Sequence, residues 1–211
     1  MSGFTLLLTR KFQIMRCLII FGLFPLFTFA QVNTALQETL IKMESKDQHI
    51  RNEMISAGWQ NITKELVAKQ TEIDEANTAK LKAIIKKHSW VTRELVGVEG
   101  VNAAFLILQH STDIAFKERM LPILKQSYLQ DGGITGQQVA LLTDRVLIAK
   151  GKKQIYGTQA DLSKGQIVIG PIEDEANVDK RRAEMELPAL AYYKKLLEKA
   201  YGIKDYPELE H

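Results

Sequence analysis

The segment Leu141–Gln159, LLTDRVLIAKGKKQIYGTQ, places an acid and a base side by side within an apolar stretch. Residues 139–149 are nearly all apolar apart from Thr143, Asp144 and Arg145, and helical spacing indicates that both faces of this stretch are buried. Removing an unpartnered charge from water costs several kcal/mol. We therefore expect Asp144 and Arg145 to pair with each other, with other polar groups or with a ligand. A buried ion pair that orients the helix fits the pattern as well as a functional site does.

The first thirty residues have the pattern of a secretory signal peptide. Basic residues at positions 10, 11 and 16 precede the apolar run Cys17–Phe29, which is short for a spanning helix of about 20 apolar residues. The triplet ending at Ala30 resembles a cleavage site, so we expect the mature chain to begin at Gln31. An uncleaved anchor is the alternative, and Met15 is a second candidate start. Cleavage predicts a periplasmic or secreted protein.

Cleavage would also change the charge of the protein. The chain has 28 basic and 25 acidic residues, and loss of the three basic residues leaves 25 of each. A neutral mature chain gives no charge-based reason to expect nucleic-acid binding. The single cysteine, Cys17, would be removed as well, which excludes disulfides, thiol catalysis and cysteine metal sites. No cofactor is predicted, and no stable membrane span after cleavage.

Apolar periodicity along the mature chain predicts a mainly α fold. We expect residues 31–211 to form a single-domain helical bundle with one small β-hairpin near the C-terminal third, at about 153–170. The predicted hairpin arms are Gln154–Gln159 and Gln166–Ile169, and His88–Gly97 is predicted to be a loop. The predicted helices are Val32–Ala57, Ile62–Lys87, Glu99–Ser111, Ile114–Leu129, one capped by Thr135 that runs through Ala149, one that begins at Asp174 or Asn177, and Ala189–Tyr201.

His110 is the best candidate for a general base. It ends the most apolar predicted helix, where its surroundings could tune its pKa. Asp113, three residues later, is either the partner of the imidazole or the N-cap of the next helix. The spacing of the two residues could also serve a metal, but such pairs are common by chance and no metal site is predicted. The alternative for His110 is a core histidine that hydrogen-bonds a neighbouring helix.

Arginines and a glycine-centred tetrapeptide suggest a site for an anion. Arg145 and either Arg181 or Arg182 could hold a carboxylate or phosphate through their guanidinium groups. The last two point about 100° apart on a helix, so only one is expected to join the site. In the tetrapeptide Tyr156–Gln159, Gly157 permits close approach of a ligand or a helix, while the tyrosine and Gln159 offer hydrogen bonds. A surface ion pair is the alternative for the arginine that does not join the site. A tight hairpin packed on the helices is the alternative for the tetrapeptide.

These motifs together resemble an uncharacterised bacterial family of unknown function. One departure is Trp90-Val91-Thr92, where the family pattern has Trp-Pro-Thr. The resemblance implies that these polar residues, with Gln48 and Arg51 among them, belong to one site; it implies no reaction. The likeness spans about Leu36 to Tyr193 and is carried by Asp47-Gln48-x-x-Arg51, Gln109-His110 with Asp113, Leu142-Thr143-Asp144-Arg145-Val146, Gly151-x-x-Gln154-x-Tyr156-Gly157-Thr158-Gln159, Pro171-Ile172-x-Asp174 and Val178-Asp179-x-Arg181-Arg182.

Two functional interpretations follow. In the first the protein is an exported hydrolase or lyase that acts on a small anionic or amide-bearing substrate, with His110 as base and Asp113 as its orienting group. Asp144 would hold Arg145 or act as the acid. In the second it is a non-catalytic module that binds a small molecule or a cell-envelope ligand. A structural scaffold with a buried polar network is a third, weaker interpretation.

Overall fold

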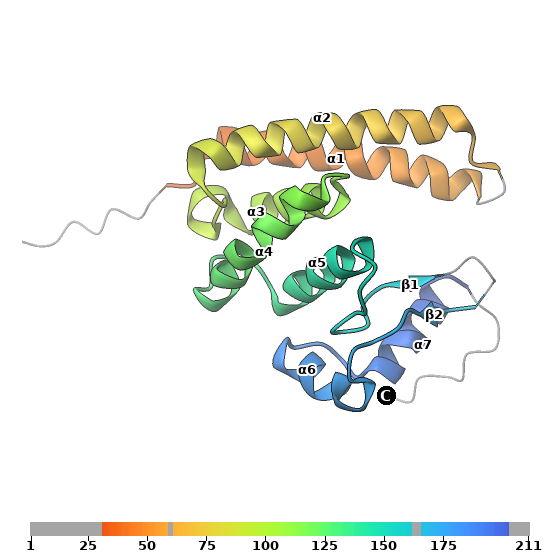
Figure 1. Ribbon diagram of the computed structural model, residues 1–211. Coiled ribbons are helices and arrows are strands. Elements are labelled where there is room, and N and C mark those ends of the chain that lie inside the picture. Colours follow the sequence, from red (N-terminus) through yellow and green to blue (C-terminus); the bar gives the residue numbers. More distant parts are fainter. Residues whose placement is uncertain (1–30, 59–60, 162–165, 203–211) are drawn as a thin grey trace, which may run out of the picture.

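The computed structural model describes residues 31–58, 61–161 and 166–202, and the predicted signal peptide lies outside them. The described residues form α1 (Thr34–Ala57), α2 (Lys64–His88), α3 (Arg93–His110), α4 (Ile114–Leu129), α5 (Gly136–Ala149), β1 (Ala160–Asp161), β2 (Val168–Ile169), α6 (Val178–Glu184) and α7 (Leu190–Ala200). Figure 1 shows three tiers, with α1 and α2 in the first, α3, α4 and α5 in the second, and the strands with α6 and α7 in the third. The predicted fold class, mainly helical with one small hairpin in the C-terminal third, is confirmed.

The first tier is a long antiparallel pair of helices. Asn33 and Thr63 cap the N-termini of α1 and α2 through their side chains, each of which accepts a hydrogen bond from a backbone N–H group. The apolar stripes on the two helices face α3, and both helices pack on it. The helices begin within two residues of their predicted starts. The main core of the domain lies below them and includes Leu40, Met43, Leu81, Val101, Phe105, Leu108, Leu124 and Leu142.

The prediction of a loop at residues 88–97 is wrong for the second half of this segment, which is helical. Helix α3 begins at Arg93, and Trp90, Val91 and Val96 are all buried beside it. Gly97 interrupts the helical geometry with a φ of 68°, a left-handed conformation that glycine adopts without strain. The helix is therefore kinked after its first turn, and the glycine at the kink is the reason why the sequence pattern indicates a loop there.

Helices α4 and α5 pack against each other and form the rest of the second tier. Asp113 is the N-cap of α4, and its side chain accepts a hydrogen bond from the Phe116 N–H group at 2.8 Å. Thr135 caps α5 as predicted, in a reciprocal arrangement with the side chain of Gln138. Both helix starts are thus fixed by side-chain oxygens.

The hairpin is shorter than predicted and begins later in the chain. Strands β1 and β2 pair antiparallel, with Ala160 opposite Ile169. The predicted first arm, 154–159, is instead an irregular loop with one isolated parallel bridge from Gln154 to Ile172. The loop is irregular because three of its backbone N–H groups bind the carboxylate of Asp144 and so cannot join a strand ladder.

The C-terminal helices are short. The helix predicted to begin at Asp174 or Asn177 is divided into a 3₁₀ turn, η2 (Glu175–Asn177), and α6. Helix α7 follows Pro188 as predicted, and its start is one residue later than expected. Across the described ranges, no helix has both the length and the apolar character that a membrane crossing requires.

Candidate functional site

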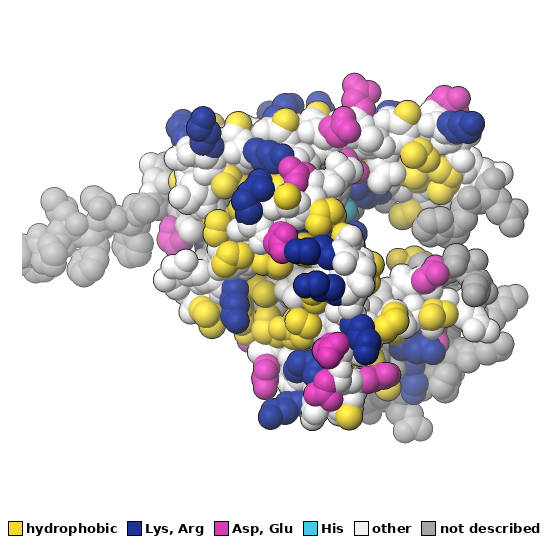
Figure 2. Space-filling model, in the orientation of Figure 1, with side chains coloured by type: hydrophobic (Ala, Val, Ile, Leu, Met, Phe, Trp, Pro, Cys, Tyr) yellow, Lys and Arg dark blue, Asp and Glu magenta, His cyan; other side chains and the backbone are white. Residues whose placement is uncertain are grey.

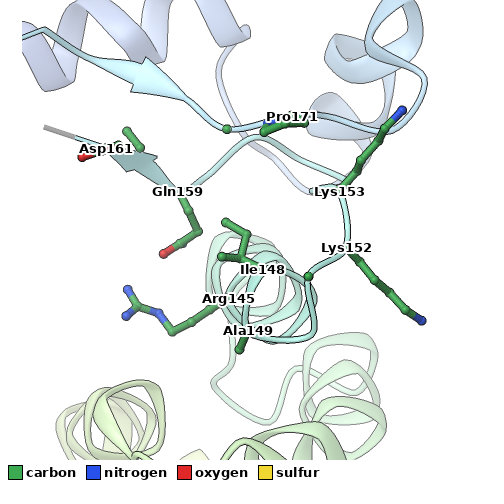
Figure 3. Close-up of a pocket in the computed structure, with 11 residues that line it drawn as sticks. Arg145, Ile148, Ala149, Lys152, Lys153, Gln159, Asp161 and Pro171 are labelled. Atoms are coloured by element: carbon green, nitrogen blue, oxygen red, sulfur yellow. The ribbon is translucent and has the colours of Figure 1, made fainter. Parts of the chain in front are cut away.

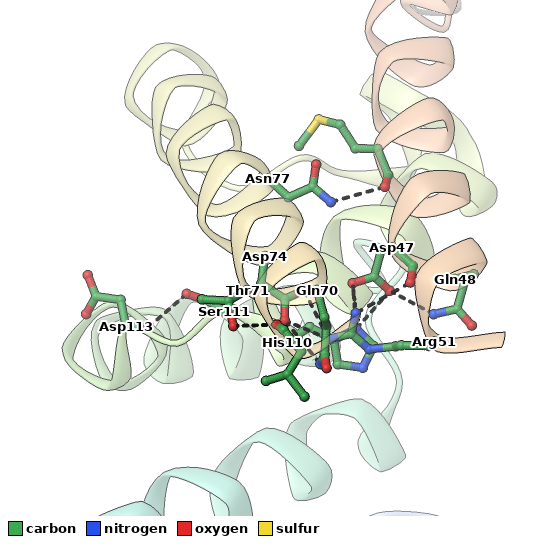
Figure 4. Close-up of polar contacts among 12 residues, drawn as sticks. Asp47, Gln48, Arg51, Gln70, Thr71, Asp74, Asn77, His110, Ser111 and Asp113 are labelled. Atoms are coloured by element: carbon green, nitrogen blue, oxygen red, sulfur yellow. Dashed lines mark hydrogen bonds and ion pairs between the residues drawn. The ribbon is translucent and has the colours of Figure 1, made fainter. Parts of the chain in front are cut away.

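An aspartate–histidine pair lies where α1 meets the end of α3 (Figure 4). Nδ1 of His110 is 3.0 and 2.9 Å from the two carboxylate oxygens of Asp47, which is 1% exposed. Because an ionised carboxylate only accepts, Nδ1 carries the hydrogen and Nε2 of the neutral ring is left with its lone pair. The His110 side chain is 16% exposed, and no described residue is hydrogen-bonded to Nε2. This is the arrangement of an oriented general base.

A network of charges holds Asp47 in place. Arg51, one turn later on α1, lies 2.8 Å from it, and Gln48 donates a hydrogen bond of 2.8 Å. Burial would raise the pKa of Asp47, but the hydrogen bond and charge of His110 and the charge of Arg51 outweigh burial and lower it. Arg51 also donates two hydrogen bonds of 3.0 Å to Asp74 on α2. The network therefore joins α1, α2 and α3 around the imidazole, as Figure 4 shows.

Two further cations, Lys117 and Arg145, interact electrostatically with this network. Lys117 on α4 is 5% exposed, and burial lowers its pKa to about 8, assisted by the charge of Arg145 and opposed by that of Asp74. Burial and the charge of Arg51 likewise lower the pKa of Arg145, and its Nε is buried with no hydrogen-bond partner. Among the described residues, neither cation makes an ion pair. The arrangement is suited to an anionic ligand.

A pocket of about 640 Å³ opens beside Arg145. Its walls come from the end of α5, the basic turn after it and strand β1, and Figure 2 shows the molecule hollowed between the first tier and the C-terminal third. In Figure 3 the guanidinium of Arg145 and the side chain of Gln159 extend into the same space. Ile148 and Ala149 supply apolar surface on the α5 side. The α5 face that looks buried in the sequence is therefore partly a pocket wall.

Asp144 has a structural position. It is fully buried and accepts hydrogen bonds from the backbone of Ile155, Tyr156 and Thr158 and from the Thr158 hydroxyl, at 2.7 to 3.1 Å for the shortest contact to each donor. It makes no ion pair with Arg145. The loop donors, and not the adjacent arginine, compensate the buried charge. With both oxygens occupied in this way, Asp144 holds the loop that carries Gln159.

Arg181 and Arg182 also bind backbone, and neither lines the pocket. Arg181 donates to the carbonyls of Ile155, Glu173 and Asp174. Arg182 is fully buried, donates to the carbonyls of Tyr156 and Pro188, and lies 4.9 Å from the ring centre of Tyr193. Both guanidinium groups therefore fasten the loop and α6 together, and the expected anion clamp reduces to Arg145.

Asp113 and Tyr156 lie apart from the imidazole as well. Asp113 caps α4 and pairs with Lys82 at 2.6 Å, so the partner expected for His110 is replaced by Asp47. The Tyr156 backbone bridges Asp144 and Arg182, while its ring packs half-buried against the core. Of the predicted ligand-binding residues, Arg145 and Gln159 line the pocket, and Gln48 and Arg51 belong to the network around Asp47.

Asp74 and Lys117 were not among the predicted site residues. Lys117 lies on the buried face of α4, one turn before Met120 and two turns before Leu124. A charged residue on an apolar helix face is energetically costly, and the same argument identifies Arg145 as a candidate. Asp74 lies in a helix rich in polar residues, where nothing in the spacing distinguishes it from the solvated face. Of these two residues, only Lys117 could therefore have been identified as a candidate from the sequence.

The fold and the site define a small helical domain with an oriented histidine on α3 and two cations, on α4 and α5, that make no ion pair among the described residues. The chain belongs to a family of unknown function, DUF6624, whose family model matches residues 34–206. This confirms the resemblance to a family of unknown function that the motifs indicate. Comparisons with curated proteins and with solved structures gave no match.

Proposed function

We propose that the protein is an exported enzyme, a hydrolase or lyase that acts on a small anionic or amide-bearing substrate. His110 is the general base, Asp47 orients it and Arg145 binds the anionic group of the substrate. The observation that carries this proposal is the contact of Nδ1 of His110 with both oxygens of Asp47. This contact fixes the tautomer and leaves Nε2 able to take a proton.

The surroundings of the imidazole narrow the reaction class. Among the described residues, no hydroxyl or thiol is hydrogen-bonded to His110, so a covalent serine or cysteine mechanism has no support. The base then acts on water, which gives a hydrolase, or on a C–H bond of the substrate, which gives a lyase. Arg145 supplies the fixed charge for the substrate, and the amide of Gln159 offers a neutral hydrogen bond in the same pocket.

The test is turnover by the mature domain, measured as product formation over a panel of small carboxylates, phosphate esters and amides. His110→Ala is expected to lower kcat by about 10²- to 10⁴-fold, because the base is lost. Arg145→Ala is expected to raise KM. The matched control is His49→Ala, since His49 is 73% exposed on α1 and pairs only with Glu53 in the described chain. Full activity of folded His110→Ala on a substrate turned over by the wild type would refute the proposal.

A binding module is the second candidate, and a specific observation favours it. Arg145 and Lys117 have no counterion among the described residues, and this arrangement would retain an anion without any reaction. In that case Arg145→Ala loses binding of the ligand, His110→Ala keeps it, and no member of the substrate panel is turned over. The same panel therefore separates the two candidates.

We also propose that the protein is exported through the signal peptide predicted for residues 1–30, to the periplasm or the exterior. Its support is the basic start followed by the apolar run Cys17–Phe29 and the cleavage-like triplet ending at Ala30. Mass spectrometry of the protein recovered from the host envelope is expected to show Gln31 as the first residue. An intact N-terminus on that protein would support an uncleaved anchor instead.

A further inference from the structure

Lys117 is an unexplained buried cation. Its helix, α4, turns this position inward together with Phe116, Met120 and Leu124, and 5% of the side chain is exposed. No hydrogen bond or ion pair reaches its ammonium from the part of the chain that the structure describes. An ammonium buried in this way destabilises the fold, and a purely structural position would be filled better by methionine or leucine.

The neighbours of Lys117 do not neutralise it. The charged groups that act on it are Arg145 from α5, which repels it, and Asp74 from α2, which attracts it. Asp74, however, already accepts two hydrogen bonds from Arg51 and a longer one of 3.5 Å from Gln70. Lys117 on α4 and Arg145 on α5 therefore repel each other across two packed helices, and neither makes an ion pair with a described residue.

We propose that Lys117 and Arg145 together form a binding site for a doubly charged oxyanion group of a small molecule. This inference rests on the anion-binding role proposed above for Arg145 and names the class of group that the site takes. A dianion neutralises both side chains, whereas a monoanion leaves one of them unpaired in a buried place. The guanidinium offers a planar pair of donors and the ammonium a compact charge, and together they match a tetrahedral oxyanion.

The proposal has a proton-linkage signature. At pH 8 roughly half of the free protein carries a neutral Lys117, because its pKa is about 8. A bound dianion favours the charged ammonium and raises this pKa toward its ordinary value of 10.5. Binding at pH 8 therefore takes up roughly half a proton, and above pH 8 the apparent affinity falls roughly tenfold per pH unit.

The experiment is isothermal titration of the mature domain with sulfate at pH 8, in two buffers of different ionisation enthalpy. Sulfate is chosen because it carries two charges and does not itself titrate near this pH. Nitrate provides the singly charged comparison. The variants are Lys117→Met and Lys117→Arg, and the matched control is Lys125→Met, which removes an exposed lysine of the same helix.

Wild type and Lys125→Met are expected to bind sulfate more tightly than nitrate, with roughly half a proton taken up. Lys117→Met is expected to bind more weakly and without proton uptake, and Lys117→Arg to bind without uptake because arginine stays charged. Absence of sulfate binding, or proton uptake that persists in Lys117→Met, would overturn the inference. The proposed catalytic function fails separately, since it is read from turnover by His110→Ala, in which both cations remain.

Discussion

Replacing Lys117 with methionine is expected to make the domain more stable. In the folded protein its pKa is lowered from 10.5 to about 8, chiefly by burial. Between these values the unfolded chain binds more protons than the folded one, so the stability of the wild type rises as pH increases from about 8 to 10.5. Below pH 8 the largely buried lysine is mostly charged in the folded protein, and this is where its removal should help most.

The magnitude follows from the same numbers. A pKa that falls from 10.5 to about 8 on folding corresponds to about 3 kcal/mol of destabilisation by the charged form. Lys117→Met removes this cost and keeps an unbranched apolar side chain of similar length in the core. The expected gain at neutral pH is therefore about 3 kcal/mol, a large part of the 5 to 15 kcal/mol typical of a folded domain.

Urea unfolding at several pH values measures the effect. With a slope of about 2 kcal/mol per molar, the midpoint of Lys117→Met should lie about 1.5 M above that of the wild type at pH 7. The difference should shrink above pH 8 and nearly vanish by about pH 10.5, because the wild-type lysine is then neutral in the folded protein and about half neutral in the unfolded chain. Lys125→Met should shift the midpoint little. An unchanged or lowered midpoint at pH 7 would mean that the ammonium is compensated, and the reasoning would fail.

Three other changes test the structural part of the site. Asp144→Asn should cost about 3 kcal/mol in urea unfolding, because an amide presents a donor to loop N–H groups, and a wild-type midpoint would refute the structural role. Because the folded protein lowers the pKa of Asp47, the free energy of unfolding should fall as pH decreases below about 4. Asp47→Asn should show a smaller fall, since it has no carboxyl group to titrate at this position. Gly157→Ala should cost about 2 kcal/mol in thermal unfolding, since φ is 64° and a Cβ would lie 2.6 Å from Ile172 Cδ1; an unchanged melting temperature would argue against this strain.

Most helices could be predicted from the sequence because each buries one apolar stripe. The limits of α4, Ile114–Leu129, are those expected from periodicity and from the capping position of Asp113. The first turn of α3 could not be found in this way, since Gly97 breaks the helical period between it and the rest of the helix. The start of β1 was also missed, because the loop before it is shaped by Asp144, a contact made more than ten residues away in the chain.

The site was only partly predictable for the same reason. His110 and Arg145 stand out because a polar group in an apolar helix is costly wherever the helix packs. Spacing does not identify the orienting carboxylate, since Asp47 is 63 residues from His110 in the chain and the nearer Asp113 has an equally plausible spacing. Asp47 is indicated only by the family resemblance, which assigns it no partner. Helical spacing reports which residues share a face, and it carries no information on which distant helix supplies the partner.

Asp144 and Arg145 show how one energetic argument leads to two different roles. They are adjacent, so their side chains leave α5 about 100° apart and meet different surroundings. The carboxylate turns to the loop after α5 and is compensated there by its N–H groups, while the guanidinium turns to the pocket and its Nε has no partner among the described residues. The cost of burying a charge is thus met within the fold for Asp144, whereas Arg145 and Lys117 make no ion pair with any described residue. Opposite effects on stability are expected for this reason, a loss in Asp144→Asn and a gain in Lys117→Met.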